Sequence, residues 1–220
     1  MKSGVLLMAH GTPSSLDEMP EYLKVVRGGR PPSPELVAEM THNYQSLPGS
    51  ASPLTAITFA QADALSRRLG ADVPVAVGMR NWHPYIGAAM TELAGKGVTR
   101  VIGLPLAPQF STLSVQKYTD AATAALPAGA TLESVRTFHA HPMLLQAFAE
   151  RVREADPRAD ETIVFTAHSL PTRVIDGGDV YADEVAATAR GVAARCVMSA
   201  LRSGPIHGSG VLPALWYAMS

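Results

Sequence analysis

The fold is decided by the stretch Gly4-Val5-Leu6-Leu7-Met8-Ala9-His10-Gly11-Thr12-Pro13, whose pattern returns as Thr162-Ile163-Val164-Phe165-Thr166-Ala167-His168-Ser169-Leu170-Pro171. Each copy is a short apolar run, followed by Ala-His, two further residues and a proline. Apolar runs of this length with β-branched members are typical of strands buried on both faces. Each histidine therefore lies where a strand ends, the edge at which open α/β sheets place their ligands. The repeat predicts two related α/β halves that each aim a histidine at a shared cleft.

The bulk composition excludes several classes of protein. The chain has 220 residues, of which 47% are hydrophobic, enough for one large domain or two small ones. Lys and Arg total 18 against 19 Asp and Glu, so no basic surface points to a nucleic-acid partner. A single cysteine, Cys196, excludes internal disulfides and fits a reducing compartment. With no apolar run long enough for a membrane span and no room for a signal peptide, we expect a cytoplasmic protein.

Strand-like runs alternate with helical patterns along the chain. The predicted strands cover residues 4–9, 73–79, 100–106, 131–137 and 162–167. The predicted helices cover residues 16–26, 34–45, 56–69, 84–94, 114–125, 143–154 and 182–194. This alternation favours a parallel sheet covered by helices on both faces.

The pattern breaks down after the last predicted helix. The second half begins near Glu161, supplies one strand and one helix, and then stops. From Cys196 to the end the only charged residue is Arg202, and neither a helical nor a strand period holds. A C-terminal element of a globular fold is rarely this poor in charge, so we interpret this segment as an aberrant tail.

Histidines are the main candidates for chemistry. His168 could be a metal ligand, a base, or a core histidine bonded to backbone, and the matching His10 with its flanking prolines favours a functional site. For His10 alone, a site and a structural role stay equally open. His139 and His141 could form a metal pair on one side of an extended segment, but we prefer a loop that precedes the helix at Pro142.

Two further segments carry polar groups that suit a ligand. Arg27 and Arg30 flank a glycine pair in a loop after a helix, and guanidinium groups there suit carboxylates, although solvated charge is the commoner explanation for either one alone. The run Ser111-Thr112-Leu113-Ser114 has the chemistry of a helix N-cap, with Tyr118 one turn further along.

Taken in order, these segments resemble the ferrochelatase family, whose members insert ferrous iron into a porphyrin to make haem. The similarity covers about residues 4–195, and the Ala-His-Ser-Leu-Pro motif is specific to this family. The matching segments are Leu6–Pro13, Arg27–Arg30, Ser52–Leu54, Gly78–Arg80, Leu106–Thr112, Ser114–Tyr118 and Phe165–Pro171.

The resemblance implies a chelatase-type α/β fold of two Rossmann-like halves with parallel sheets, the second half being incomplete. Residues 1–158 would form the N-terminal half, residues 159–195 the start of the second half, and residues 196–220 the aberrant tail, which is not native to the fold. The implied protein is a lyase of haem biosynthesis with porphyrin and Fe²⁺ as substrates. No tightly bound cofactor is expected.

The resemblance also assigns roles to individual residues. His168 becomes the iron ligand and the acceptor of pyrrole protons. His10 becomes a second metal-facing group on the porphyrin's other side, where many relatives carry Tyr. The positions that would line the porphyrin or hold its propionates are His10, Arg27, Asn43, Tyr44, Ser52 and Tyr118, with Asn43-Tyr44 standing where relatives often have Arg-Tyr.

One departure from the family affects the expected activity. Family members continue for most of another domain past residue 195, and that part supplies an acidic partner of the histidine. Asp183 and Glu184 lie on the wrong helix to replace it. We therefore expect a truncated ferrochelatase with little or no turnover. The alternatives are a non-catalytic porphyrin- or metal-binding fragment, and a cobalt or nickel chelatase of tetrapyrrole synthesis. The sequence does not distinguish protoporphyrin IX from coproporphyrin III as substrate, and it leaves the oligomeric state open.

Overall fold

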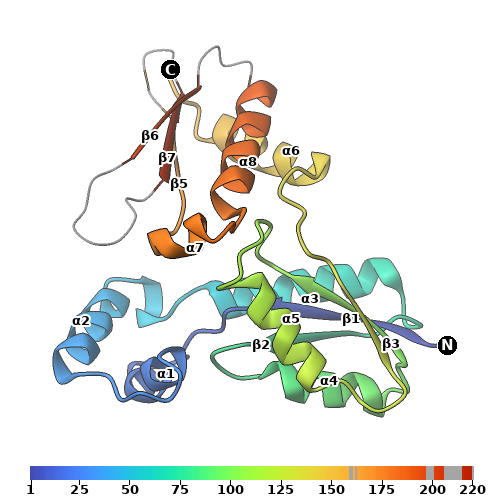
Figure 1. Ribbon diagram of the computed structural model, residues 1–220. Coiled ribbons are helices and arrows are strands. Elements are labelled where there is room, and N and C mark those ends of the chain that lie inside the picture. The colour runs from blue at the N-terminus through green and yellow to red at the C-terminus, as the bar shows by residue number, and fades with distance from the viewer. Residues whose placement is uncertain (159–160, 162, 197–200, 206–214, 220) are drawn as a thin grey trace. The chain divides into compact units, whose positions relative to one another are not determined.

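The computed structural model describes residues 1–158, 161, 163–196, 201–205 and 215–219. The chain forms two compact units, shown in Figure 1, and each is described by itself. The first unit comprises Met1–Leu106 and Lys117–Val135, and the second comprises Ala107–Gln116 and Arg136–Ser220. The loop of residues 107–116 therefore belongs to the second unit, although the segments on both sides of it belong to the first.

The first unit is built on a four-stranded parallel sheet, which confirms the predicted α/β fold. Its strands are β1 (Ser3–Ala9), β2 (Val75–Met79), β3 (Arg100–Pro105) and β4 (Thr131–Ser134), in the order β2-β1-β3-β4. In the centre of the sheet, Val5 of β1 pairs with Val75 of β2 on one side and with Ile102 of β3 on the other. Strand β4 is shorter than the predicted 131–137, because residues from Arg136 onward join the second unit.

Strand β1 is buried on both faces, as its apolar run predicts. Leu6 and Met8 point into a core formed with helices α4 (Ile86–Gly95) and α5 (Val115–Ala124). The alternate residues, including Leu7, point into a second core that packs against α3 (Leu54–Leu69). Because successive side chains of a strand face opposite sides, only an uninterrupted apolar run can satisfy both cores.

A small helical subassembly completes the first unit. It contains the short 3₁₀ helices η1 (Leu16–Glu18) and η2 (Pro48–Ser50) and the helices α1 (Met19–Val26) and α2 (Pro34–Gln45). Ser33 caps α2 by accepting a hydrogen bond from the Leu36 amide at 3.3 Å, and Pro34 occupies the first turn, where a missing amide hydrogen costs nothing. The predicted helices over 16–26 and 34–45 are confirmed.

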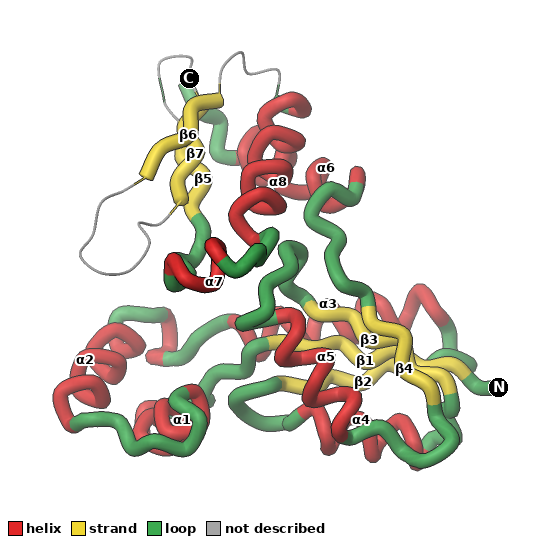
Figure 2. The backbone as a smooth tube through the Cα atoms, in the orientation of Figure 1, coloured by secondary structure: helices red, strands yellow, loops and turns green. Residues whose placement is uncertain are grey.

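In its described residues, the second unit combines three helices with a small sheet. The helices are α6 (Pro142–Glu154), α7 (Thr172–Asp176) and α8 (Tyr181–Arg195), of which the short α7 was not predicted. The strands are β5 (Ile163–Thr166), β6 (Leu201–Pro205) and β7 (Leu215–Met219), in the order β5-β7-β6, seen in Figure 2.

Two expectations for β5 are wrong. Its neighbour β7 runs antiparallel, whereas the sequence predicts a parallel sheet. Strand β6 also pairs antiparallel with β7, so the described strands of this sheet form no parallel pair. Strand β5 is also not buried on both faces, since Val164 is 51% exposed while Phe165 packs against α8 and α6. Of the predicted tail, residues 197–200, 206–214 and 220 lie outside the described residues.

Helix α6 groups with the second unit, whereas the predicted N-terminal half extends to residue 158. The physical reason is its packing on α8, where Leu145 and Ala149 of α6 form one core with Val192. The two helices approach closely at Gly191, because a Cβ there would lie only 2.6 Å from Cδ1 of Leu145. The boundary at 158 stays a prediction about the two related halves.

In the described part of the chain, no helix combines the length and apolar character required to cross a bilayer.

We expect the substitution Leu93→Ala to lower the free energy of unfolding by about 2–5 kcal/mol, because it removes buried methyl groups and leaves a cavity. Leu93 lies on α4 and is 0% exposed within the core under β1. The matched control is Leu69→Ala at the end of α3, where the side chain is 40% exposed and the change should stay within about 0.5 kcal/mol. Urea unfolding followed by circular dichroism measures both, and equal stabilities for the two variants would contradict the packing described.

Candidate functional site

His168 follows the end of β5, as the sequence predicts. The strand ends at Thr166, and the chain continues without regular structure to Pro171, which caps α7. Leu170 is buried and anchors this turn, while the His168 side chain is exposed. The imidazole is therefore presented to solvent by a short segment whose two ends are held by a strand and a helix.

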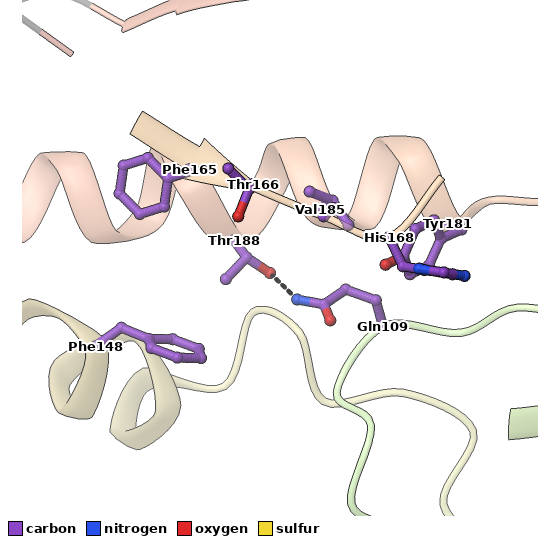
Figure 3. Close-up of a pocket in the computed structure, with 9 residues that line it drawn as sticks. Gln109, Phe148, Phe165, Thr166, His168, Tyr181, Val185 and Thr188 are labelled. Carbon is purple, nitrogen blue, oxygen red and sulfur yellow. Dashed lines mark hydrogen bonds between the residues drawn. The ribbon is translucent and has the colours of Figure 1, made fainter. Parts of the chain in front are cut away.

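A pocket of about 340 Å³ lies beside His168 within the second unit. Figure 3 shows His168 and Tyr181 next to each other at one end of it, with Phe148 and Phe165 toward the other end. Its lining residues are Gln109, Phe148, Phe165, Thr166, Ala167, His168, Tyr181, Val185 and Thr188. An aromatic and aliphatic wall with a few polar groups is the usual character of a small-molecule site.

Tyr181 supports the backbone of His168. Burial raises the pKa of the Tyr181 hydroxyl, and its hydrogen bond to the His168 backbone works in the opposite direction without cancelling that effect. The phenol therefore remains neutral at physiological pH. It holds the main chain of the histidine, which leaves the imidazole itself available at the pocket.

Gln109 brings the loop of residues 107–116 to the same pocket. Its Nε2 donates to Oγ1 of Thr188 at 3.0 Å, a contact drawn in Figure 3. Oγ1 of Thr188 in turn lies 3.0 Å from two backbone carbonyl oxygens, those of His139 and Glu184. Since the hydroxyl proton goes to a carbonyl, its lone pair is left to accept from the amide. This orients the Gln109 side chain at the pocket wall.

Glu184, one turn before Thr188 on the same face of α8, also holds the loop. This buried carboxylate accepts from the Phe110 amide and from the Thr137 hydroxyl, both at 2.7 Å from Oε2. Nδ1 of His139 lies 3.3 Å from the same oxygen, and Nη1 of Arg136 lies 3.9 Å from Oε1. A buried carboxylate needs such donors, because desolvation without them costs several kcal/mol. Glu184 thus ties residues 110 and 136–139 to α8.

Asp179, just before α8, holds the next residues of the loop. Its Oδ2 accepts from the Thr112 amide at 2.7 Å, from the Thr112 hydroxyl at 2.8 Å and from the Ser111 hydroxyl at 3.1 Å. Its Oδ1 accepts from the Tyr181 amide at 3.0 Å. Burial acts to raise the pKa of Asp179, but the hydrogen bonds from Thr112, Tyr181 and Ser111 outweigh it and lower the pKa below its usual value. The carboxylate is therefore ionised in the folded protein.

The histidine pair at 139 and 141 has a structural role, so the preferred loop interpretation is confirmed. His141 is the N-cap of α6, and its Nδ1 accepts from the Met143 amide at 3.3 Å. His139 lies beside Thr137 and Glu184, with Nδ1 2.8 Å from the Thr137 hydroxyl. Among the described residues, no group of three or more His, Cys, Asp or Glu side chains is arranged to hold a metal ion.

His10 lies in the first unit, directly after β1, and is half-buried. Its Nε2 is 3.1 Å from the hydroxyl of Tyr22, and Nδ2 of Asn81 lies 3.1 Å from Nδ1 and 3.2 Å from Nε2. Both partners are buried. Tyr22 is also hydrogen-bonded to Tyr44, and burial, followed by the effect of Tyr44, raises the pKa of Tyr22. Tyr22, which was not predicted from the sequence, thus links the two predicted site residues His10 and Tyr44.

The remaining predicted porphyrin contacts have different surroundings. Arg27 is exposed at the C-terminus of α1, and Asn43 is exposed on α2. Ser52 is half-buried and accepts from the Leu54 amide at 3.3 Å. Tyr118 is buried in the core with α4, where burial raises its pKa and the nearby Arg80 acts against that increase. Their contacts with a porphyrin stay predictions.

A sequence signal for the missed residues existed on α8. Glu184 and Thr188 are one turn apart and stand among the apolar residues Val185, Ala189 and Val192 that face the core. Polar residues at the spacing of a buried stripe need internal partners, so this pattern indicates a hydrogen-bonded role. Tyr22 and Asn81 carried no comparable signal, since their partners are distant in sequence.

Comparison with known proteins establishes the family. A model of the ferrochelatase family matches residues 2–209. The chain belongs to the ferrochelatase family. The match includes His10 and His168 with all segments that carried the resemblance, whereas strand β7 lies beyond it.

Individual relatives agree with this assignment. Over 205 residues the chain is 38% identical to the ferrochelatase of Herpetosiphon aurantiacus, a match that covers 87% of this chain and 67% of the relative. The ferrochelatase of Deinococcus radiodurans is 41% identical over 204 residues, covering 87% and 64%. The coproporphyrin III ferrochelatase of Bacillus subtilis is 32% identical over 205 residues, covering 87% and 66%. The chain thus spans about two thirds of the length of these relatives.

We expect Asp179→Asn to lower the free energy of unfolding by about 1–3 kcal/mol at neutral pH, because an amide nitrogen replaces an oxygen that accepts three hydrogen bonds. The folded-state pKa of Asp179 is depressed, so its contribution is fully present above the ordinary Asp pKa of about 3.9 and is lost as pH falls through the folded value. The difference between the two proteins should therefore shrink below about pH 4.

Urea unfolding of the wild type and the variant at neutral and acidic pH measures this effect. The control is Asp176→Asn on α7, because that side chain is exposed and its loss should change the stability little at either pH. A destabilisation by Asp179→Asn that persists unchanged at acidic pH would show that the carboxylate charge is not its source.

Proposed function

We propose that this protein inserts Fe²⁺ into a porphyrin, with His168 as the ligand of the incoming metal and the acceptor of pyrrole protons. The observation that carries the proposal is the position of the segment Ala167–Pro171, which lies within the family match and presents an exposed imidazole at a pocket. Membership of the ferrochelatase family supports the same reaction. Iron is a substrate in this reaction rather than a resident cofactor.

The chemistry of the reaction explains why a histidine suits this position. Two pyrrole protons must leave the porphyrin while Fe²⁺ loses water and enters the ring. Imidazole titrates near neutrality and also binds ferrous iron, so one side chain can serve both steps. Because the His168 side chain is exposed, a proton that it accepts can pass to solvent. Tyr181 keeps the main chain in place without occupying the imidazole.

The porphyrin requires an apolar surface and a group for its carboxylates. We propose that His10 and Tyr44, linked through Tyr22, contact the porphyrin. Arg27 is an exposed guanidinium group in the segment shared with the family, and such a group pairs well with a propionate. Binding energy from these contacts can hold the ring bent, which exposes the nitrogen lone pairs to the metal.

The porphyrin substrate is proposed to be protoporphyrin IX or coproporphyrin III. Relatives carry the names ferrochelatase and coproporphyrin III ferrochelatase, and both kinds match this chain over similar lengths. The two porphyrins differ in the number of carboxylates. Measuring the affinity of the protein for each porphyrin at low and at high salt would therefore show which one is the substrate. A preference for coproporphyrin III that weakens with salt would indicate additional carboxylate contacts.

We expect His168→Ala to reduce the rate of metal insertion toward the upper end of the range of about 10²–10⁴-fold that is typical for loss of a general base. The reason is that the substitution removes a metal ligand as well. Porphyrin affinity should change little, because apolar contacts and Arg27 provide it. His10→Ala should have a milder effect, and His42→Ala on the exposed side of α2 serves as the control.

Turnover and porphyrin binding should be measured side by side for the three variants. Near-normal turnover of His168→Ala would exclude the proposed role. A loss of porphyrin binding in proportion to the loss of turnover would assign His168 to binding instead.

We expect this 220-residue chain to insert metal far more slowly than the Deinococcus radiodurans relative. Strand β5, which leads to His168, is bordered by the antiparallel β7, and β7 lies beyond the residues shared with the family. The neighbouring strand of β5 is therefore not among the residues that match the family. An assay of Fe²⁺ or Zn²⁺ insertion by both proteins decides the matter. Comparable turnover would refute the expectation, and porphyrin binding without turnover would identify a binding fragment.

A further inference from the structure

We infer that Tyr22 and Asn81 are positioning residues that hold the His10 imidazole in one orientation and one tautomer. With both ring nitrogens engaged, His10 then meets the porphyrin as a fixed ring and does not act as a metal ligand. The inference rests on the proposed function only for the statement that His10 contacts a porphyrin. The hydrogen-bond arrangement itself is a property of the protein alone.

The backbone brings the partners to His10. Beyond the ends of β1 and β2 the two segments stay side by side. The Arg80 amide donates to the Ala9 carbonyl at 3.0 Å, and the Asn81 amide donates to the His10 carbonyl at 2.9 Å. The next residue, Gly11, has a φ of 82°, and a Cβ there would lie 2.8 Å from the backbone nitrogen of Trp82. Only glycine allows this close approach, so the position of His10 against Asn81 is determined by the main chain.

Hydrogen-bond chemistry selects one arrangement of the protons. An amide nitrogen can only donate, so Asn81 requires a ring nitrogen of His10 without a proton. The shorter of its two contacts, 3.1 Å, is to Nδ1. The proton of a neutral imidazole then sits on Nε2 and is donated to the Tyr22 oxygen 3.1 Å away. Tyr22 can pass its own proton to the hydrogen-bonded Tyr44. The three contacts Asn81–His10, His10–Tyr22 and Tyr22–Tyr44 thus each have one donor and one acceptor.

The partners are more deeply buried than the histidine. Asn81 is 4% exposed and Tyr22 is 6% exposed, whereas His10 is half-buried. The Tyr22 ring meets the Trp82 ring edge to face, with centroids 5.9 Å apart. Nε1 of Trp82 donates to Glu18 at 3.1 Å, and Glu18 also accepts from the Ser14 amide at 2.7 Å. Buried, hydrogen-bonded supports of this kind fix the rotamer of a site residue.

The first test needs no activity. In the full chain with ¹⁵N-labelled histidine, at about pH 9, where imidazole with an ordinary pKa of about 6.5 is neutral, the ¹⁵N shifts of His10 should show the Nε2–H tautomer. Tyr22→Phe removes only the accepting oxygen and should give a mixture of tautomers, as should Asn81→Ala. The control is Tyr85→Phe, which removes a hydroxyl from the ring that meets His83 edge to face, with centroids 4.5 Å apart, and should leave His10 unchanged. An unchanged His10 spectrum in Tyr22→Phe would overturn the inference.

The second test measures binding in the same proteins. Loss of one orienting hydrogen bond should weaken porphyrin binding about 2- to 10-fold in Tyr22→Phe, with no change in Tyr85→Phe. Addition of Zn²⁺ without porphyrin should leave the His10 nitrogen resonances in place, and a direct shift there would overturn the exclusion of metal ligation. If the tautomer responds as expected but no protein binds porphyrin, the proposed function fails while the positioning role of Tyr22 and Asn81 stands.

Discussion

The burial of β1 on both faces is the constraint on which the first unit depends. Its side chains alternate between a core under α4 and α5 and a core under α3, so no polar side chain fits from Val5 to Ala9. The first imidazole therefore appears directly after the strand, at His10. The same geometry places Asn81 next to it, because β2 ends beside β1 and the two segments continue in parallel.

The second unit depends on carboxylates rather than on a buried strand. Asp179 and Glu184 are buried at the start of α8 and accept hydrogen bonds from the amides of Thr112 and Phe110. The loop of residues 107–116 has no regular structure of its own over most of its length. These charge-assisted hydrogen bonds therefore hold its backbone in place of the backbone hydrogen bonds that a strand would make with its neighbour. Its position then sets Gln109 at the pocket beside His168.

The two histidines of the repeat differ in what surrounds them. Both nitrogens of His10 lie within 3.2 Å of buried hydrogen-bonding partners. The His168 side chain is exposed at a pocket, and Tyr181 contacts its backbone. The first arrangement suits a group that keeps its orientation during a reaction, whereas the second suits a group that exchanges protons and a metal ion. Equivalent sequence motifs can therefore support different roles when their supporting residues differ.

The sequence by itself determined the parallel sheet of the first unit, most helix boundaries, the strand-end position of both histidines and the membership of the ferrochelatase family. These features follow from local apolar periods and short motifs, which are readable in a single segment. Only the tertiary structure decided the antiparallel pairing of β5, the attachment of residues 107–116 to α8 and the contacts of His10. Each of these depends on partners far apart in the chain, so no local pattern specifies them.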